Sequence, residues 1–145
     1  MSKNRFIVIL LALCLVLGTV PFALGATAPT TNKVSISALY VGAPGEKPNQ
    51  EYVKVSNSGT TAVKMKGWKI TDKGKIHTYY FPSSYTLKAK SKVTLRSGKG
   101  TNSASTLYWN KYSFIWNNHD PKHNENGDTA YLYNAQGKLV SSRNG

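Results

Sequence analysis

Residues 49–72, with the sequence NQEYVKVSNSGTTAVKMKGWKITD, constrain the fold most, because they predict two strands joined by a turn. Residues 51–56 alternate with period two, as a half-buried strand requires. One face holds Glu51, Val53 and Val55, and the other holds Tyr52, Lys54 and Ser56. Asn57, Ser58 and Gly59 then supply turn dihedrals that β-branched residues resist. The segment therefore predicts two strands that are each buried on one face.

The second of these strands changes side part-way along. Val63 and Met65 have one parity, whereas Trp68 and Ile70 have the other, and Gly67 lies between the two pairs. A glycine inside a strand often marks a β-bulge, which inserts one extra residue. We therefore expect a bulge at Gly67 that brings all four apolar side chains onto one buried face.

Further motifs follow in a fixed order. The segment just described contains an N-x-E-Y-V strand, an N-x-G turn and a G-W-x-I-x-D ending. Three motifs follow it: an F-P segment at Phe81-Pro82, a strand that leads into a G-x-G-T turn at 92–100, and a W…WNN…GDTA-x-L-Y ending at 109–133. This order resembles the lamin-tail domain family, in its secreted prokaryotic type, over about residues 34–142. The resemblance implies an immunoglobulin-like β-sandwich that acts as a non-catalytic interaction unit, sometimes appended to secreted nucleases or membrane-associated hydrolases.

Residues 1–25 predict a secretory signal peptide, because Lys3 and Arg5 precede an apolar run and small residues follow it at 23–25. An uncleaved anchor is the alternative, since the apolar stretch has about the 20 residues that a spanning helix needs. Residues 26–33 are rich in Thr, Ala and Pro and are expected to form a short linker. The protein is therefore expected to be secreted or extracellular. Association with the cell surface is the alternative, and membrane contact is expected only through an uncleaved signal.

Residues 34–145 are expected to form one all-β domain, the lamin-tail-like β-sandwich, and to be monomeric. Cys14 is the only cysteine of the chain and lies in the signal segment, so the mature domain is expected to rely on an apolar core rather than on disulfides. Short strands with frequent Gly and Asn turns predict a sandwich or barrel independently of the resemblance. The expected core residues are Val34, Ile36, Val53, Val55, Val63, Met65, Trp68, Ile70, Phe81, Leu87, Val93, Leu95, Leu107, Phe114, Ile115, Ala130, Leu132 and Leu139.

The chain is strongly basic, with a formal net charge of +13. Most of the cations are lysines, which act as mobile point charges, whereas bidentate recognition favours arginine. This composition indicates diffuse attraction to polyanions such as nucleic acid or an anionic envelope polymer, without sequence specificity. The alternative is that the lysines only keep an exposed sheet soluble and unaggregated. The expected polyanion-binding residues are Lys88, Lys90, Lys92 and Arg96, as a basic row on one strand face, together with Lys64, Lys66 and the neighbouring Lys54.

Aromatic residues offer stacking surfaces beside these cations. Tyr108 and Trp109, which precede an Asn-Lys pair, are the expected exposed stacking pair. Trp68 and Trp116 are expected in the core instead, because of their places in the family pattern.

Residues 119–126 depart from the family, which joins WNN to GD almost directly. This insertion and the aspartate after it gather two imidazoles and three carboxylates, which are ligand types for zinc or calcium. Turn formation explains such residues equally well, so we expect a solvated loop, with no bound metal and no cofactor. The candidate ligands are His119, Asp120, His123, Glu125 and Asp128.

No pattern of catalytic residues is present. The sequence has no G-x-S-x-G elbow and no phosphate-binding glycine loop before a helix. The expected function is therefore a non-catalytic secreted or cell-surface binding module whose basic face engages anionic polymers, either DNA or the cell envelope. The alternatives are a structural protein–protein interaction module and a metal-binding accessory domain of an extracellular nuclease system.

Overall fold

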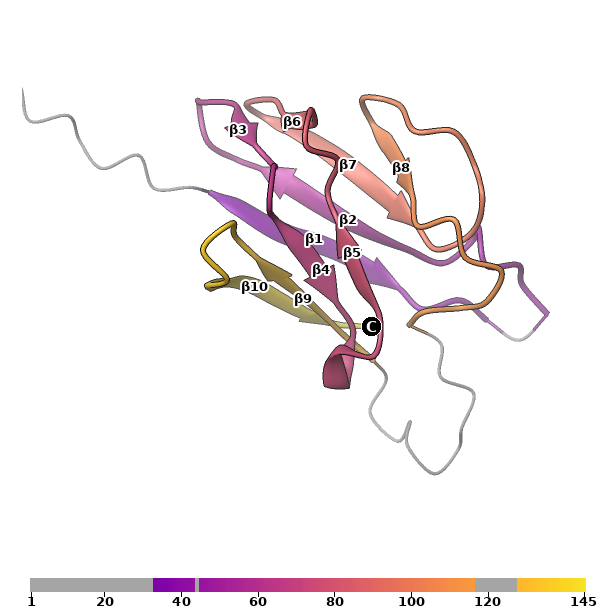
Figure 1. Ribbon diagram of the computed structural model, residues 1–145. Helices are drawn as coiled ribbons and strands as arrows, with labels where there is room; N and C mark the ends of the chain where they lie inside the picture. Colours follow the sequence, from indigo (N-terminus) through magenta and orange to yellow (C-terminus); the bar gives the residue numbers. More distant parts are fainter. Residues whose placement is uncertain (1–32, 44, 117–127) are drawn as a thin grey trace, which may run out of the picture. The chain divides into compact units, whose positions relative to one another are not determined.

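Short strands make up the domain (Figure 1), and their side chains alternate between buried and exposed. The computed structural model describes residues 33–43, 45–116 and 128–145, so the expected signal peptide, residues 1–25, and nearly all of the linker lie outside the described residues. No helix among the described residues is long and apolar enough to cross a membrane. The elements are β1 (Val34–Tyr40), β2 (Tyr52–Asn57), β3 (Val63–Lys64), β4 (Lys69–Thr71), the 3₁₀ turn η1 (Lys73–Lys75), β5 (Thr78–Tyr80), β6 (Thr86–Leu87), β7 (Ser91–Arg96), β8 (Thr106–Tyr108), β9 (Thr129–Tyr133) and β10 (Leu139–Asn144).

The strands form two four-stranded sheets, in the orders β1-β2-β7-β8 and β10-β9-β4-β5, and a two-stranded sheet of β3 and β6. All pairs are antiparallel except β7 and β8, which are parallel. The Ile36 N–H donates a hydrogen bond of 3.1 Å to Ser141 Oγ, which links β1 of one sheet to β10 of the other. The predicted all-β, immunoglobulin-like β-sandwich is confirmed.

Apolar side chains from both large sheets pack into one core, as the alternation in the sequence predicts. Val63 is half-buried and packs against the core, and Phe114 is half-buried. Leu139 is 47% exposed, and its expected core position is wrong. The register between β9 and β10 shifts between Leu139 and Ser141, and Val140 packs against the core instead. A shift of one residue exchanges the two faces of a strand, which is why parity counted from the sequence misplaced Leu139.

The change of buried face near Gly67 is caused by a turn between two strands and not by the expected bulge within one strand. The Trp68 N–H donates to the Met65 carbonyl oxygen at 3.0 Å, and Gly67 has a φ of 79°, which the third position of a type II turn requires. The turn lies between β3, which pairs with β6, and β4, which belongs to a large sheet. Met65, Trp68 and Ile70 are nevertheless buried together, so the predicted change of face is confirmed.

Glu51, just before β2, is a fully buried carboxylate with 0% exposure. Its Oε2 accepts the Ile115 N–H at 2.7 Å, and its Oε1 accepts the Trp116 N–H at 2.8 Å. Charge-assisted hydrogen bonds of this kind compensate the cost of burying a carboxylate. Glu51 therefore fixes the segment that contains Trp116 to the start of β2.

Candidate functional site

The outer face of the sheet β1-β2-β7-β8 carries a row of three tyrosines and one arginine. Val53 and Leu95 point into the core, so their neighbours Tyr52 and Arg96 point outward. The strand register aligns Tyr40 with Tyr52, Tyr52 with Arg96, and Arg96 with Tyr108. We call Tyr40, Tyr52, Arg96 and Tyr108 the tyrosine–arginine row. Tyr40 and Tyr52 on this outer face are suited to stacking against flat groups of a ligand, whereas the ring of Tyr108 packs closely against Gly100.

Cations surround Tyr52 at the middle of this row. The rings of Tyr40 and Tyr52 are stacked, with centroids 5.6 Å apart. Lys54 Nζ lies 4.8 Å from the Tyr52 centroid, and Arg96 Cζ lies 6.0 Å from it. Both distances are within the range of cation–π attraction. An aromatic surface and positive charge therefore occur together on this face.

Two further cross-strand pairs of β2 and β7 extend this outer face. Lys54 pairs with Thr94, and Ser56 pairs with Lys92. Lys54, Lys92 and Arg96, all of them expected polyanion-binding residues, thus lie on one outer face.

The expected continuous row from Lys88 to Arg96 is wrong in its first half. β6 ends at Leu87 and β7 begins at Ser91, so Lys88 and Lys90 lie in the turn between two strands. Lys90 has a φ of 53°, and its Nζ donates to the Ser58 carbonyl oxygen at 2.7 Å. The alternation of lysine with small residues happens to continue through the turn, where period two has no structural meaning.

Lys64 and Lys66 do not form one strand row with Lys54 either. Lys64 is in β3, Lys66 is in the turn before Trp68, and both side chains are exposed. Lys54 belongs to a different sheet. The structure therefore separates these two lysines from the sheet of the tyrosine–arginine row.

Tyr108 and Trp109 are not an exposed pair, because adjacent strand residues point to opposite faces. Tyr108 is half-buried in the row, whereas Trp109 is 8% exposed and packs against Tyr79 and Trp116 with centroid distances of 5.5 and 5.6 Å. The burial of Trp116 is confirmed. Sequence reasoning missed Tyr40 and Tyr52 as stacking residues. The signal for Tyr52 was its parity, which it shares with Lys54 and Ser56 on the polar face of β2.

A basic pocket of about 270 Å³ continues from the arginine of the row. Arg96 donates through Nη1 to the carbonyl oxygen of Asn49, which lines this pocket. Lys99 Nζ lies 3.7 Å from the ring centroid of Tyr112, which is 83% exposed, and also donates to its hydroxyl. The residues that line the basic pocket are Lys47, Pro48, Asn49, Gly98, Lys99, Lys111 and Tyr112. Three lysines and an exposed tyrosine thus repeat the chemistry of the sheet face.

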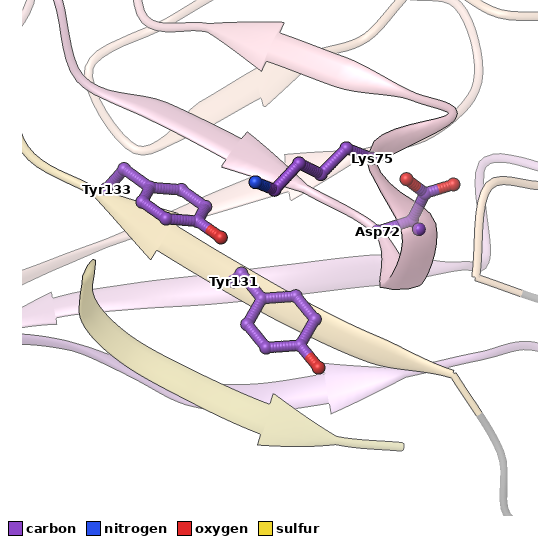
Figure 2. A pocket seen from close by; sticks show the side chains of 5 residues that line it. Asp72, Lys75, Tyr131 and Tyr133 are labelled. Carbon is purple, nitrogen blue, oxygen red and sulfur yellow. The ribbon is translucent and has the colours of Figure 1, made fainter. Parts of the chain in front are cut away.

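A second pocket, of about 250 Å³, lies against the other large sheet (Figure 2). It is lined by Asp72, Gly74, Lys75, Tyr131 and Tyr133, and we call it the η1 pocket. Figure 2 shows Lys75 extending from the η1 turn toward Tyr133 and away from the Asp72 carboxylate.

Asp128, the one candidate metal ligand that the structure describes, holds backbone groups. Its Oδ1 accepts the Lys73 N–H at 3.1 Å and the Thr129 N–H at 2.6 Å. Burial raises the pKa of the Asp128 carboxyl, although these two bonds act in the opposite direction. Within residues 33–43, 45–116 and 128–145, no group of three or more His, Cys, Asp or Glu could hold a metal ion. The other candidates, His119, Asp120, His123 and Glu125, lie outside the described residues.

The model of the Lamin Tail Domain family matches residues 27–144. The chain belongs to the lamin tail domain family. The match confirms the resemblance seen in the motifs, and this family consists of non-catalytic, immunoglobulin-like domains. No curated protein matches the chain closely enough to count as a relative. The secreted prokaryotic subtype stays a prediction.

Proposed function

We propose that this lamin tail domain is a non-catalytic binding module, and that the outer face of β1-β2-β7-β8 engages anionic polymers, either DNA or an envelope polymer. The observation that carries the proposal is the tyrosine–arginine row with Lys54 over Tyr52. Lysines attract phosphates or carboxylates as point charges, and tyrosines add stacking that tolerates any sequence.

The net charge supports the same function. With 19 basic and only 6 acidic residues, the chain attracts polyanions over long range. Lysine-dominated contacts give little base-edge readout, so binding should not depend on sequence. The basic pocket beyond Arg96 would extend the contact along a polymer chain.

A non-catalytic function agrees with how the described carboxylates are used. Glu51, Asp72 and Asp128 all accept backbone N–H groups. Glu46 accepts the hydroxyl of Tyr40 at 2.9 Å and the Ala43 N–H at 2.7 Å. Carboxylates that hold the backbone in place are poor candidates for general acid–base catalysis.

The location of the protein belongs to the proposal as well. Residues 1–25 would direct export and residues 26–33 would link the signal to the domain. Sequencing the N-terminus of exported protein tests this part. A start near Ala26 supports a cleaved signal, whereas an intact Met1 in the membrane fraction supports an anchor.

The binding proposal is tested with a panel of polymers. Single-stranded DNA, duplex DNA, heparin and neutral dextran are titrated against the purified protein at several salt concentrations. We expect binding to the three anionic polymers and none to dextran. Tyr52→Ala should weaken the binding of single-stranded DNA several-fold, because stacking contributes about 1–3 kcal/mol per base.

Tyr80→Ala is the matched control, because Tyr80 is 62% exposed and lies on β5 of the other sheet. It should leave DNA affinity unchanged. If no anionic polymer binds, the domain is better explained as a structural protein–protein interaction module. Stoichiometric zinc or calcium in the purified protein would favour the metal-binding accessory role.

A further inference from the structure

The η1 pocket lies on a different sheet from the tyrosine–arginine row and is built by a braced turn. The backbone N–H of His77 donates to Asp72 Oδ1 at 2.9 Å, and His77 Nδ1 lies 2.7 Å from Asp72 Oδ2. Asp128 holds the Lys73 N–H from the side of β9. Two carboxylates thus fix the turn that bears Lys75, and both oxygens of Asp72 already have a partner.

Lys75 has an unusual backbone conformation in this turn. Its φ is 60°, and Gly74 before it has a φ of 85°. Only a few per cent of non-glycine residues adopt the left-handed region, and lysine has no special preference for it. A strained residue held by its surroundings is a reason to look for a role of its side chain.

Two ammonium groups lie near the ring of Tyr133, one from Lys75, which lines the pocket, and one from Lys69, which is not among its lining residues. Lys75 Nζ lies 5.9 Å from the centroid of Tyr133 (Figure 2), and Lys69 Nζ lies 5.6 Å from it. The one ion pair found within the described part of the chain joins His77 and Asp72, so no described carboxylate pairs with either lysine. Two like charges at one ring repel each other, and an anion between them would relieve the repulsion.

The rest of the lining is aromatic apart from Gly74 and the Asp72 carboxylate, whose two oxygens already contact His77. Tyr131 also lines the pocket, and no cation of the described residues lies over its ring. Among the described residues, neither Tyr131 nor Tyr133 uses its hydroxyl in a hydrogen bond, so both hydroxyls can serve a ligand. The pocket therefore offers positive charge beside the Tyr133 ring, the apolar ring of Tyr131, and one hydroxyl on each tyrosine.

The volume limits what the η1 pocket can enclose. At about 250 Å³ the η1 pocket is smaller than the roughly 300–1,000 Å³ of sites for drug-sized ligands. It has room for one ring with a small substituent. A whole nucleotide, with base, sugar and phosphate, is too large to be enclosed, and a lone phosphate would leave the ring of Tyr131 uncovered.

We propose that the η1 pocket binds a single acidic sugar ring. The apolar face of the sugar packs on Tyr131, its carboxylate lies between Lys75 and Lys69, and the tyrosine hydroxyls bond to the sugar hydroxyls. This site is separate from the proposed polymer-binding face and does not depend on it.

The test measures binding of methyl glucuronide, methyl glucoside and AMP to the purified protein by chemical-shift changes and calorimetry. We expect the glucuronide to shift signals of Tyr131, Tyr133 and Lys75 and to bind at least tenfold more tightly than either other probe. Lys75→Gln should weaken the binding of methyl glucuronide at least tenfold. Lys75→Gly should do the same while raising the melting temperature, because glycine relieves the left-handed φ.

Lys64→Gln is the matched control, because it removes one exposed lysine from the two-stranded sheet of β3 and β6 and should leave glucuronide binding unchanged. Glucoside or AMP binding as tight as glucuronide, or glucuronide binding that survives Lys75→Gln, would overturn the proposal. Absence of any binding would overturn it too. Since the polymer proposal depends on Tyr52 and the other sheet, the two proposals can fail separately.

Discussion

The two faces of residues 51–56 show how one strand serves two purposes. Inward, Glu51, Val53 and Val55 have 0% exposure and belong to the core and its buried hydrogen bonds. Outward, Tyr52 and Lys54 are partly exposed and form the cation–π contact of the sheet face. Since alternate side chains point to opposite faces, a substitution can change stability without changing the outer surface, or the reverse. The following predictions test whether the two faces are separable.

The largest effect is expected in the core. Trp68 is buried at 4% exposure, so Trp68→Ala should lower the free energy of unfolding by about 3–5 kcal/mol. Chemical denaturation measures this loss. DNA affinity per folded molecule should stay the same, and an unchanged denaturation midpoint would place Trp68 outside the core.

A smaller but still large effect is expected for Glu51. Glu51→Ala leaves the N–H groups of Ile115 and Trp116 without their acceptor, and each unsatisfied buried group costs about 1–3 kcal/mol. Glu51→Gln should cost less, because its side-chain oxygen still accepts one of the two bonds. Equal denaturation midpoints for Glu51→Ala and the unsubstituted protein would show that these bonds contribute nothing.

The pH dependence of stability provides a third test of the core. Burial raises the pKa of Tyr79 to about 12, whereas an unfolded tyrosine ionises near 10. The folded state therefore holds this proton more tightly, so its contribution to stability is complete below about pH 10 and is lost as the pH rises toward 12. Replacing Tyr79 by Phe should flatten the fall in melting temperature over this range. An equally steep fall would show that another group causes it.

Alternation within strands predicted most of the core, but it failed where the chain leaves a strand. Leu139 was misplaced because a register shift in β10 reverses parity after that residue. Lys88 and Lys90 were assigned to a strand face because their spacing resembles a strand, although the chain turns there. The alternation of buried and exposed residues holds only within one uninterrupted strand. Where a strand ends or shifts its register depends on pairing with distant strands.

The candidate site was predictable in part for the same reason. Lys54, Lys92, Arg96 and Tyr108 were identified from local patterns, and the outer parity of Tyr52 was visible. Their arrangement on one outer face depends on the registers of β1 with β2, β2 with β7 and β7 with β8. The η1 pocket was not predicted, because it combines a turn and a distant strand, β9, and no local motif marks it.

The most direct test of the separation compares two triple variants in DNA binding and in denaturation. Lys54→Gln, Lys92→Gln and Arg96→Gln remove three charges from the sheet face, whereas Lys64→Gln, Lys66→Gln and Lys138→Gln remove three exposed charges elsewhere. The negative slope of log affinity against log salt concentration for single-stranded DNA should become shallower by up to about 2 in the first variant, at about 0.7 for each phosphate that the protein no longer neutralises. It should change little in the second variant. Both denaturation midpoints should stay close to that of the unsubstituted protein, because exposed charges contribute little to stability. Equal salt slopes in the two variants, or a large loss of stability in the first alone, would contradict the account.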